Sequence, residues 1–462
     1  MSSELPPPAP AAAPGRGVVR FLWTSNPLYV VSAGLFLYGL QTSFTDPTRE
    51  SDAAALTAGL GGYTLLLAAA ALFLVRYAGY WNDLRTVLLL VVLMFLATSV
   101  TFDELLITSP DRGALLNAAG LLFAVAVTEG VLRGIRLRLP AGFRAPYYLT
   151  LALFFLYPVA LAPATGAPNS DALLWGLWGF APAAGVVFLL LLPAARRGPG
   201  YVRGNGSPWP WPFFPWSLFV FLGVAVCGRA FLLCWSFHLL DGAGAEDLVF
   251  GPYFLAPFGL AVVVVLMELG LVARSRPTQV VALLAALALV PLSGVGVGDS
   301  AVAADFLGRY ADRLGGTPLF VALLAAGGFA VVAWARKVPF AADALTLVLV
   351  GLALVGPDTL RLTDARAPHL GFFAAAWAVQ LGVGLWRREA WRWGLAGGMP
   401  AVWVGLEGWR VYLTARAVMA GLDQLVAGLL LLPLAVLVSL GKAGVLGRWV
   451  RSWRGLPDDA PA

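Results

Sequence analysis

Long apolar runs alternate with short polar connections along the chain, from Pro27 to Leu440. The run from Phe258 to Arg276 is typical, because it is almost continuously apolar, holds a single acid, Glu268, and ends on arginine. Apolar runs of about 18 residues or more with few charges are typical of helices that cross a hydrocarbon layer about 30 Å thick. The pattern therefore predicts an all-α fold, a polytopic bundle of transmembrane helices.

We predict about fourteen spans, with twelve as the lower bound, and each span is bounded by turn residues or charges. They lie near residues 27–45, 53–75, 84–102, 114–133, 146–164, 172–194, 215–237, 251–273, 277–296, 318–335, 340–357, 369–386, 393–411 and 418–440.

Composition agrees with a membrane protein. Of the 462 residues, 60% are hydrophobic and only 12% are charged, whereas a soluble chain carries about 25% charged residues. The net charge of +6 does not indicate a nucleic-acid partner, because membrane proteins collect basic residues in their cytoplasmic loops. The basic residues are mostly Arg and the chain is rich in Ala, Gly, Leu and Val. This composition suggests a GC-rich bacterial genome. We therefore expect a multi-pass protein of the bacterial cytoplasmic (inner) membrane, with the lipid bilayer as its partner.

Charge in the connections predicts the orientation. Connections rich in arginine, such as 133–144 and 196–203, alternate with acidic or neutral ones along nearly the whole chain. The positive-inside rule then puts both termini in the cytoplasm, which requires an even number of crossings. The thirteenth span fits less well, because the turn after it holds Arg410 and Arg416 on the predicted outer side. A re-entrant segment at 393–411 is the alternative there.

The sequence divides into a long membrane domain between two tails. We predict a disordered Pro/Ala-rich cytoplasmic tail at 1–20, a single transmembrane domain at 21–445, and a basic-then-acidic cytoplasmic tail at 446–462. One long cytoplasmic connection contains GNGSPWPWPFFPW at 204–216. Because Pro cannot continue a helix and Trp prefers the headgroup level, we read this stretch as an interfacial segment. A docking site for a protein partner is the alternative.

Two sets of similar stretches indicate an internal repeat. Spans one, five and nine open with SNPLYVVSA, RAPYYLTLA and SRPTQVVAL, and spans four, eight and twelve place Glu129, Glu268 and Gln380 shortly before Gly and Arg. These landmarks predict parallel four-helix repeats at 27–138, 146–276 and 277–388, followed by two extra helices at 391–440. The alternative needs no repeat, because Pro is favoured at helix starts and Arg at cytoplasmic helix ends.

Arg229 is the most unexpected polar residue, because it lies in the outer half of the seventh span. A charge at mid-membrane costs about 2.5–3.5 kcal/mol on insertion scales, so it should face protein or water. Glu407 lies at the same depth in the thirteenth span, and we expect the two to form an ion pair. A gate or anion site at Arg229, and a side chain that reaches the outer surface, are the alternatives.

Three further polar residues lie toward the cytoplasmic side of their spans. Glu129 has Arg133 one turn further on, an ordinary helical ion pair. Glu268 has no such neighbour and needs another partner, and Gln380 holds the matching place in the twelfth span. For Glu268 an interhelical hydrogen bond is the structural interpretation, and proton coupling is the functional alternative.

The candidate residues on the predicted outer side are Asp103, Glu104, His238 and His369, and Asp241 and Asp358 fall on the same side. Imidazoles and carboxylates can bind zinc, but these residues lack the ligand spacing of a zinc motif, so we predict no metal and no cofactor. The chain also lacks the G-x-x-x-x-G-K-[ST], H-E-x-x-H and G-x-S-x-G motifs, and we assign no catalytic residue.

Three functional hypotheses remain. The first is transport or translocation of a small or lipid-like solute. The second is a non-catalytic membrane component that anchors or assembles a cell-envelope complex. The third is a membrane-embedded enzyme acting on a lipid-linked substrate, for which Asp103 and Glu104 are the candidate acids. Transport predicts that Glu129, Glu268 and Gln380 converge on one cavity.

Overall fold

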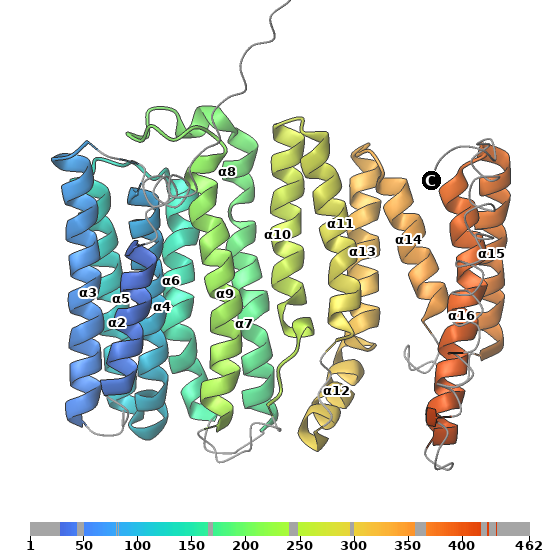
Figure 1. Cartoon of the computed structure of the whole chain (residues 1–462), viewed down its shortest axis with the longest axis horizontal. Helices are drawn as coiled ribbons and strands as arrows, with labels where there is room; N and C mark the ends of the chain where they lie inside the picture. The colour runs from blue at the N-terminus through green and yellow to red at the C-terminus, as the bar shows by residue number, and fades with distance from the viewer. Residues whose placement is uncertain are drawn as a thin grey trace, which may run out of the picture. The chain divides into compact units, whose positions relative to one another are not determined.

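The computed structural model describes residues 28–43, 50–79, 81, 83–164, 170–239, 248–295, 300–355, 366–416, 423–424 and 431. Within these residues all the regular structure is helical (Figure 1). The chain forms two compact units, Met1–Asp364 and Ala365–Ala462, and each is described by itself. The predicted tails, 1–20 and 446–462, and all but three residues of the fourteenth predicted span lie outside the described residues.

The first unit holds most of the helices. They are α2 (Leu28–Ser43), α3 (Glu50–Arg76), α4 (Leu84–Thr108), α5 (Pro110–Gly134), α6 (Ala141–Leu161), α7 (Asp171–Leu189), α8 (Leu192–Arg197), α9 (Phe213–Leu239), α10 (Pro252–Val272), α11 (Arg276–Ser293), α12 (Ala301–Leu314), α13 (Pro318–Ala335) and α14 (Ala341–Leu354), with short 3-10 turns at Ala162–Ala164 and Pro199–Val202. The second unit holds α15 (Arg366–Arg387) and α16 (Ala390–Arg416).

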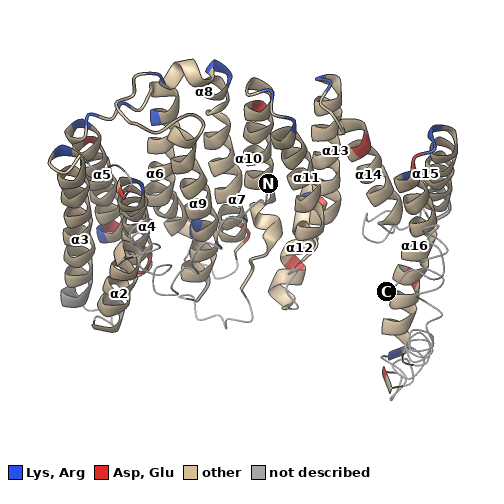
Figure 2. Cartoon of the chain, turned by 45° about the horizontal axis from the view of Figure 1, so that its top comes forward, with Lys and Arg blue, Asp and Glu red and all other residues tan. Residues whose placement is uncertain are grey.

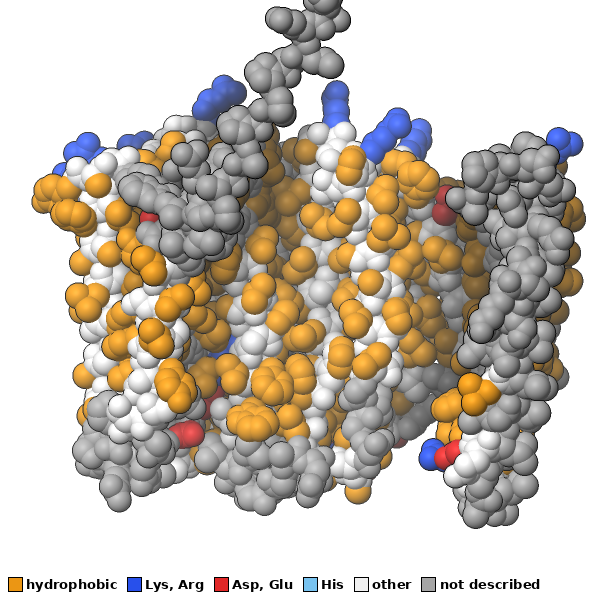
Figure 3. Space-filling model, viewed as in Figure 1, with side chains coloured by type: hydrophobic (Ala, Val, Ile, Leu, Met, Phe, Trp, Pro, Cys, Tyr) orange, Lys and Arg blue, Asp and Glu red, His pale blue; other side chains and the backbone are white. Residues whose placement is uncertain are grey.

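Helices therefore form at thirteen of the predicted spans. Among the described residues, ten helices are long and apolar enough to cross a membrane. These ten candidate spans lie in α3, α4, α5, α6, α7, α9, α10, α11, α13 and α15, and the apolar helices α2 and α14 are shorter. Large apolar side chains cover the outer sides of these helices (Figure 3). Such a surface would be unfavourable in water and suits a lipid environment.

One helix was not predicted. The connection between the ninth and tenth predicted spans was read as a loop, but α12 forms there, with polar and apolar residues on different sides. Phe306 and Tyr310 are buried and contact the ring of Trp175, while Arg309 forms a 2.5 Å ion pair with Asp171 at the start of α7. The mixed composition of the segment concealed an amphipathic pattern.

Local sequence signals explain where the helices begin. Ser170, Ser275, Ser300 and Thr317 each accept a hydrogen bond from the backbone N–H three residues on, at the starts of α7, α11, α12 and α13. These hydroxyls satisfy donors that lack a partner in the first turn of a helix. Proline stands at the first turn of α5, α10, α11 and α13, where its fixed φ is compatible with the helix.

Four helices end in the same unusual way. After α5, α10, α13 and α15 the chain turns through a basic residue with positive φ: Arg136, Arg274, Lys337 and Arg388. The next N–H then bonds back to the carbonyl five residues earlier: Leu137 to Leu132, Ser275 to Gly270, Val338 to Ala333 and Glu389 to Gly384. Glycine usually takes the left-handed position, because other residues lose about 1–2 kcal/mol there. The chain keeps a positive charge at these ends in spite of that cost.

Basic residues gather at one end of the first unit's helices (Figure 2). We call this the basic end. It carries Arg76, Arg85, Arg133, Arg136, Arg138, Arg144, Arg196, Arg197, Arg203, Arg274, Arg276, Arg336 and Lys337. Its turns lie between α3 and α4, α5 and α6, α7 and α9, α10 and α11, and α13 and α14. The basic end thus coincides with the connections that the sequence predicts to be cytoplasmic.

Helix α4 is the most enclosed helix of the first unit. It packs against α2, α3, α5, α6 and α9, and Phe95 and Phe102 on it are almost fully buried. A close turn joins it to α5, where a Cβ on Gly113 would stand 2.3 Å from the Cα of Leu106. Only glycine permits that approach.

In the second unit, α15 and α16 pack side by side, and the indole of Trp377 donates a 2.8 Å hydrogen bond to the Ala396 carbonyl. The thirteenth predicted span falls within α16, a single helix of 27 residues. The boundary between the two units lies inside the third predicted repeat, 277–388.

Replacing Lys337 tests the unusual helix ends. We expect Lys337→Gly to raise the free energy of unfolding by about 1 kcal/mol, because glycine adopts a positive φ without the Cβ clash. Lys337→Ala removes the same charge but keeps the clash, so it should give no gain. Thermal unfolding of the purified protein measures both, and equal stability of the two variants would contradict this account.

Candidate functional site

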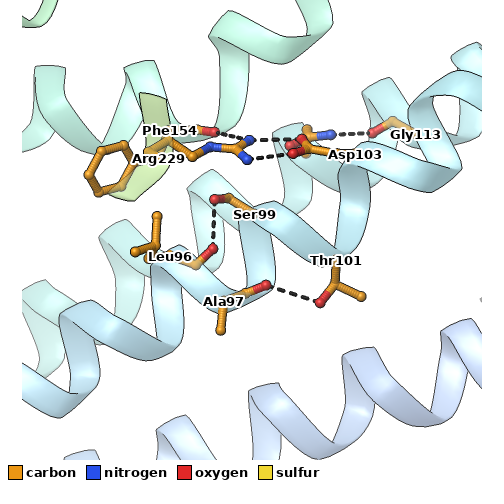
Figure 4. A network of polar contacts seen from close by, with 9 residues as sticks. Leu96, Ala97, Ser99, Thr101, Asp103, Gly113, Phe154 and Arg229 are labelled. Carbon is orange, nitrogen blue, oxygen red and sulfur yellow. Dashed lines mark hydrogen bonds and ion pairs between the residues drawn. The ribbon is translucent and has the colours of Figure 1, made fainter. Parts of the chain in front are cut away.

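A fully buried ion pair joins α4 and α9 (Figure 4). The Arg229 guanidinium donates to both oxygens of Asp103, with Nη1 to Oδ2 at 2.5 Å and Nη2 to Oδ1 at 2.8 Å. Both side chains are 0% exposed. This two-pronged arrangement is the strongest geometry for an arginine and a carboxylate, and it leaves no net charge in the apolar interior.

The same guanidinium also binds a third helix. Its Nη2 donates to the Phe154 carbonyl of α6 at 3.0 Å. Pro158 stands four residues further along α6 and has no N–H to give to that carbonyl. Arg229 therefore satisfies a buried acceptor that the helix itself cannot satisfy, and one side chain holds α4, α6 and α9 together.

The expected partner of Arg229 was wrong. The carboxylate that Arg229 binds is Asp103, where the sequence predicted Glu407. The third span was taken to end at residue 102, which put Asp103 in an outer loop, but α4 continues to Thr108. Glu407 lies in α16 of the second unit. Because Arg229 is fully enclosed and holds a carboxylate, it is not open to an external anion.

The other candidate residues on the predicted outer side are Glu104, His238 and His369. Glu104 follows Asp103 on α4 and is half-buried. His238 lies near the end of α9, and its side chain is outside the described part of the structure; His369 lies in α15. No group of three His, Cys, Asp or Glu side chains able to hold a metal occurs among the described residues.

Glu129 forms a cluster at the basic end between α5 and α6. It has the predicted ion pair with Arg133, at 3.4 Å, and it also accepts hydrogen bonds from Arg144 and from the Tyr148 hydroxyl. Its carboxylate is thus used in joining two helices.

Glu268 finds the partner that its own helix does not provide. It is buried on α10 and accepts from Arg196 Nε on α8 at 3.0 Å and from Arg336 Nη1, just after α13, at 2.6 Å. The bond to Glu268 raises the pKa of the Arg336 guanidinium above its ordinary value, so the arginine stays charged. This cluster joins α8, α10 and the end of α13.

Gln380 on α15 has an arginine partner of its own. Its side-chain oxygen accepts from Arg392 Nη1 of α16 at 3.1 Å, and Arg392 also donates to Glu389 at 2.5 Å. Glu129, Glu268 and Gln380 each have their own arginine partners. Within the first unit, Glu129 lines one of the two cavities described below and Glu268 lines neither of them.

An apolar cavity lies beside the Glu129 cluster. It has a volume of about 300 Å³ and lies between α4, α5 and α9, with Tyr147 of α6 and Trp209 of the 198–212 connection in its wall. Arg85, at the start of α4, is its one charged lining residue, and its guanidinium carbon is 5.5 Å from the centre of the Phe213 ring. Largely apolar cavities of this size with a few polar groups are typical ligand sites.

A polar hollow adjoins this cavity at the basic end. Its volume is about 530 Å³, and Leu132, Leu137 and Leu139 line both spaces. The remaining lining consists of Glu129, Arg133, Arg136, Arg138 and Arg144. The apolar cavity therefore adjoins an arginine-lined hollow. A ligand with one apolar part and one polar part would match this arrangement.

Sequence reasoning missed most of this site. The Trp-rich segment 204–216 was interpreted as an interfacial segment, with no cavity expected there, and Trp209 lines the cavity. The arginines at 133–144 were counted only as orientation signals. Residues such as Arg85, Tyr147 and Ser217 meet in the cavity only through folding, and no local pattern indicates that they do.

Fold and site together define a multi-pass, all-helical protein of membrane-like composition. No protein-family model, no curated protein and no solved structure matches the chain.

Removing the Asp103–Arg229 pair one residue at a time tests its structural role. We expect Asp103→Leu or Arg229→Leu alone to destabilise the protein by about 3–5 kcal/mol, because each leaves an unpaired buried charge. The double variant should recover about half of this loss, because no unpaired charge remains. It should remain about 1–3 kcal/mol below the parent, because the Phe154 carbonyl loses its donor.

Thermal unfolding in detergent, together with the yield of folded protein, measures these effects. As a control, Arg229→Leu combined with Glu407→Leu should be no more stable than Arg229→Leu alone. If the double Asp103/Arg229 variant were no more stable than the less stable single variant, the coupling between the two residues would be refuted.

Proposed function

We propose that the chain is a multi-pass integral membrane protein that binds a lipid-like molecule at its basic end and transports or translocates it. The proposal includes fourteen spans with both termini in the cytoplasm, in the bacterial inner membrane. The positive charge at the basic end supports this orientation. The observation that carries the function is the cavity of about 300 Å³ between α4, α5 and α9.

The cavity suits an apolar chain better than a polar solute. Most of its lining is aliphatic or aromatic, and two of its polar groups, Thr128 and Tyr147, share a 3.0 Å hydrogen bond with each other. Because these hydroxyls satisfy one another, an apolar ligand would leave neither without a partner. A small polar solute would find few polar groups to replace its water.

A non-catalytic anchoring or assembly component is the second candidate. It is favoured by the separate arginine partners of Glu129, Glu268 and Gln380, which use these residues in helix–helix contacts. A protein partner at 204–216 belongs to this candidate. The enzyme hypothesis has less support, because both oxygens of Asp103 are bound to the buried Arg229.

The four-helix repeat also remains a proposal. It is supported by the arginine partners that Glu129, Glu268 and Gln380 each have, and by the left-handed basic residue after α5, α10 and α15. Since α13 ends in the same way, this type of helix end does not define the repeat alone.

Cysteine labelling tests the proposed orientation. In a chain with Cys227→Ala and Cys234→Ala, we introduce Asp111→Cys or Arg203→Cys at exposed positions on opposite sides of the proposed bilayer. A membrane-impermeant thiol reagent added outside intact cells should modify only the first, because the basic end faces the cytoplasm. Labelling of the second alone, or of both, would overturn the orientation.

Filling the cavity tests the proposed activity. Ser217 lines the cavity on α9, and we expect Ser217→Trp to lower lipid affinity by about tenfold, a loss of about 1.4 kcal/mol. Native mass spectrometry of the purified protein measures bound lipid. Movement of a fluorescent lipid between the leaflets of reconstituted vesicles should slow by a similar factor.

Val220→Trp is the matched control, because Val220 lies on the same helix, is 65% exposed and does not line the cavity. It should leave binding and movement unchanged. Lipid that binds in the cavity without being moved would favour the anchoring candidate. No difference between the two tryptophan variants would remove the cavity from the function.

A further inference from the structure

The arginine-lined hollow extends the apolar cavity in a chemically specific way. Its lining holds four arginines and one glutamate, a net charge of +3. Glu129 is already bound to Arg133 and Arg144. Arg136 and Arg138 are exposed and have no acidic partner within the described part of the chain. Two guanidinium groups are therefore available to an anion.

We propose that the cavity and the hollow together bind a lipid with a phosphate in its headgroup. The inference rests on the proposed function and names its substrate class. The chain of the lipid occupies the apolar cavity, and Arg136 and Arg138 bind the phosphate. Arginine suits this task because its planar group can donate two parallel hydrogen bonds to phosphate oxygens.

Leu132, Leu137 and Leu139, which we call the leucine wall, set how deeply the headgroup can lie. Because Leu132, Leu137 and Leu139 line both spaces, a molecule that crosses this wall has its apolar part on one side and its charged part on the other. Arg85, which lines the cavity itself, contributes positive charge on the inner side of that wall. A water-soluble phosphate would use the hollow and gain nothing from the cavity.

The backbone that carries the two arginines is held in place. The Leu137 N–H bonds to the Leu132 carbonyl at 2.9 Å, and the Arg138 N–H donates to the Asn205 carbonyl at 2.7 Å. A Cβ on Gly206 would stand 2.3 Å from the Arg136 carbonyl oxygen, so the connection after α8 packs directly on this turn. A fixed turn lowers the entropy lost when the arginines order around a phosphate.

The test uses the full-length protein in nanodiscs and two lipids with identical acyl chains, phosphatidic acid and diacylglycerol, which differ in the phosphate. We expect the parent to bind phosphatidic acid more tightly. Arg136→Gln combined with Arg138→Gln should lower the affinity for phosphatidic acid about thirtyfold, since each arginine near an anionic lipid raises the affinity about fivefold. The affinity for diacylglycerol should not change.

Arg274→Gln combined with Arg276→Gln is the matched control. Both residues are exposed at the same basic end, one of them also has a positive φ, and neither lines the two spaces. This variant should bind both lipids like the parent. An equal loss in the control would show general surface attraction and overturn the site.

The remaining outcomes separate the two proposals. Equal affinity for the two lipids, with binding still weakened by Ser217→Trp, would overturn the phosphate assignment and leave the lipid cavity standing. Failure of both lipids to bind the parent would refute the proposed function as well. If inorganic phosphate at the same concentration as the lipid displaced the bound lipid, the hollow would be a site for a soluble anion, and the lipid headgroup would be overturned as its ligand.

Discussion

The absence of water from the hydrocarbon layer is the constraint on which the described structure depends. A polar group there must find its partner within the protein. Arg229 shows the consequence most clearly, because it neutralises Asp103 and also satisfies the carbonyl that Pro158 leaves without a donor. A proline in α6 and two charges on other helices, each unfavourable alone, together form a contact that holds three helices.

The basic end differs from this interior, because its basic side chains are exposed. There the chain places Arg136, Arg274 and Lys337 at left-handed positions where glycine would be more stable. Acids nearby are enclosed by arginines, as at Glu129 and Glu268. The result is an excess of positive charge that is held by a well-defined backbone, and it lies next to the apolar cavity.

These two conditions change the role that is assigned to the polar residues in the spans. Taken singly, Glu129 and Glu268 resemble members of a proton path. In the structure each has its own arginine partners and joins its own set of helices. The apolar cavity is bounded by residues that are inconspicuous in the sequence, such as Ser217, Thr128 and Leu137.

The sequence by itself determined the helical class and the position of thirteen predicted helices, because apolar length and period are local properties. It also identified Arg229, since one charge in an apolar run is visible without a structure. It did not determine the partner of Arg229, because Asp103 and Arg229 are 126 residues apart in the chain and the end of the third span was set six residues too early.

Only the tertiary structure decided between Asp103 and Glu407, and only it brought together Arg85, Tyr147, Trp209 and Ser217 around one cavity. The amphipathic helix α12 was missed for a related reason. Its apolar residues Phe306 and Tyr310 pack on Trp175, which lies far from them in the sequence. Pairing and enclosure depend on which helices pack together. That choice is made by contacts between residues far apart in the chain, which no local pattern records.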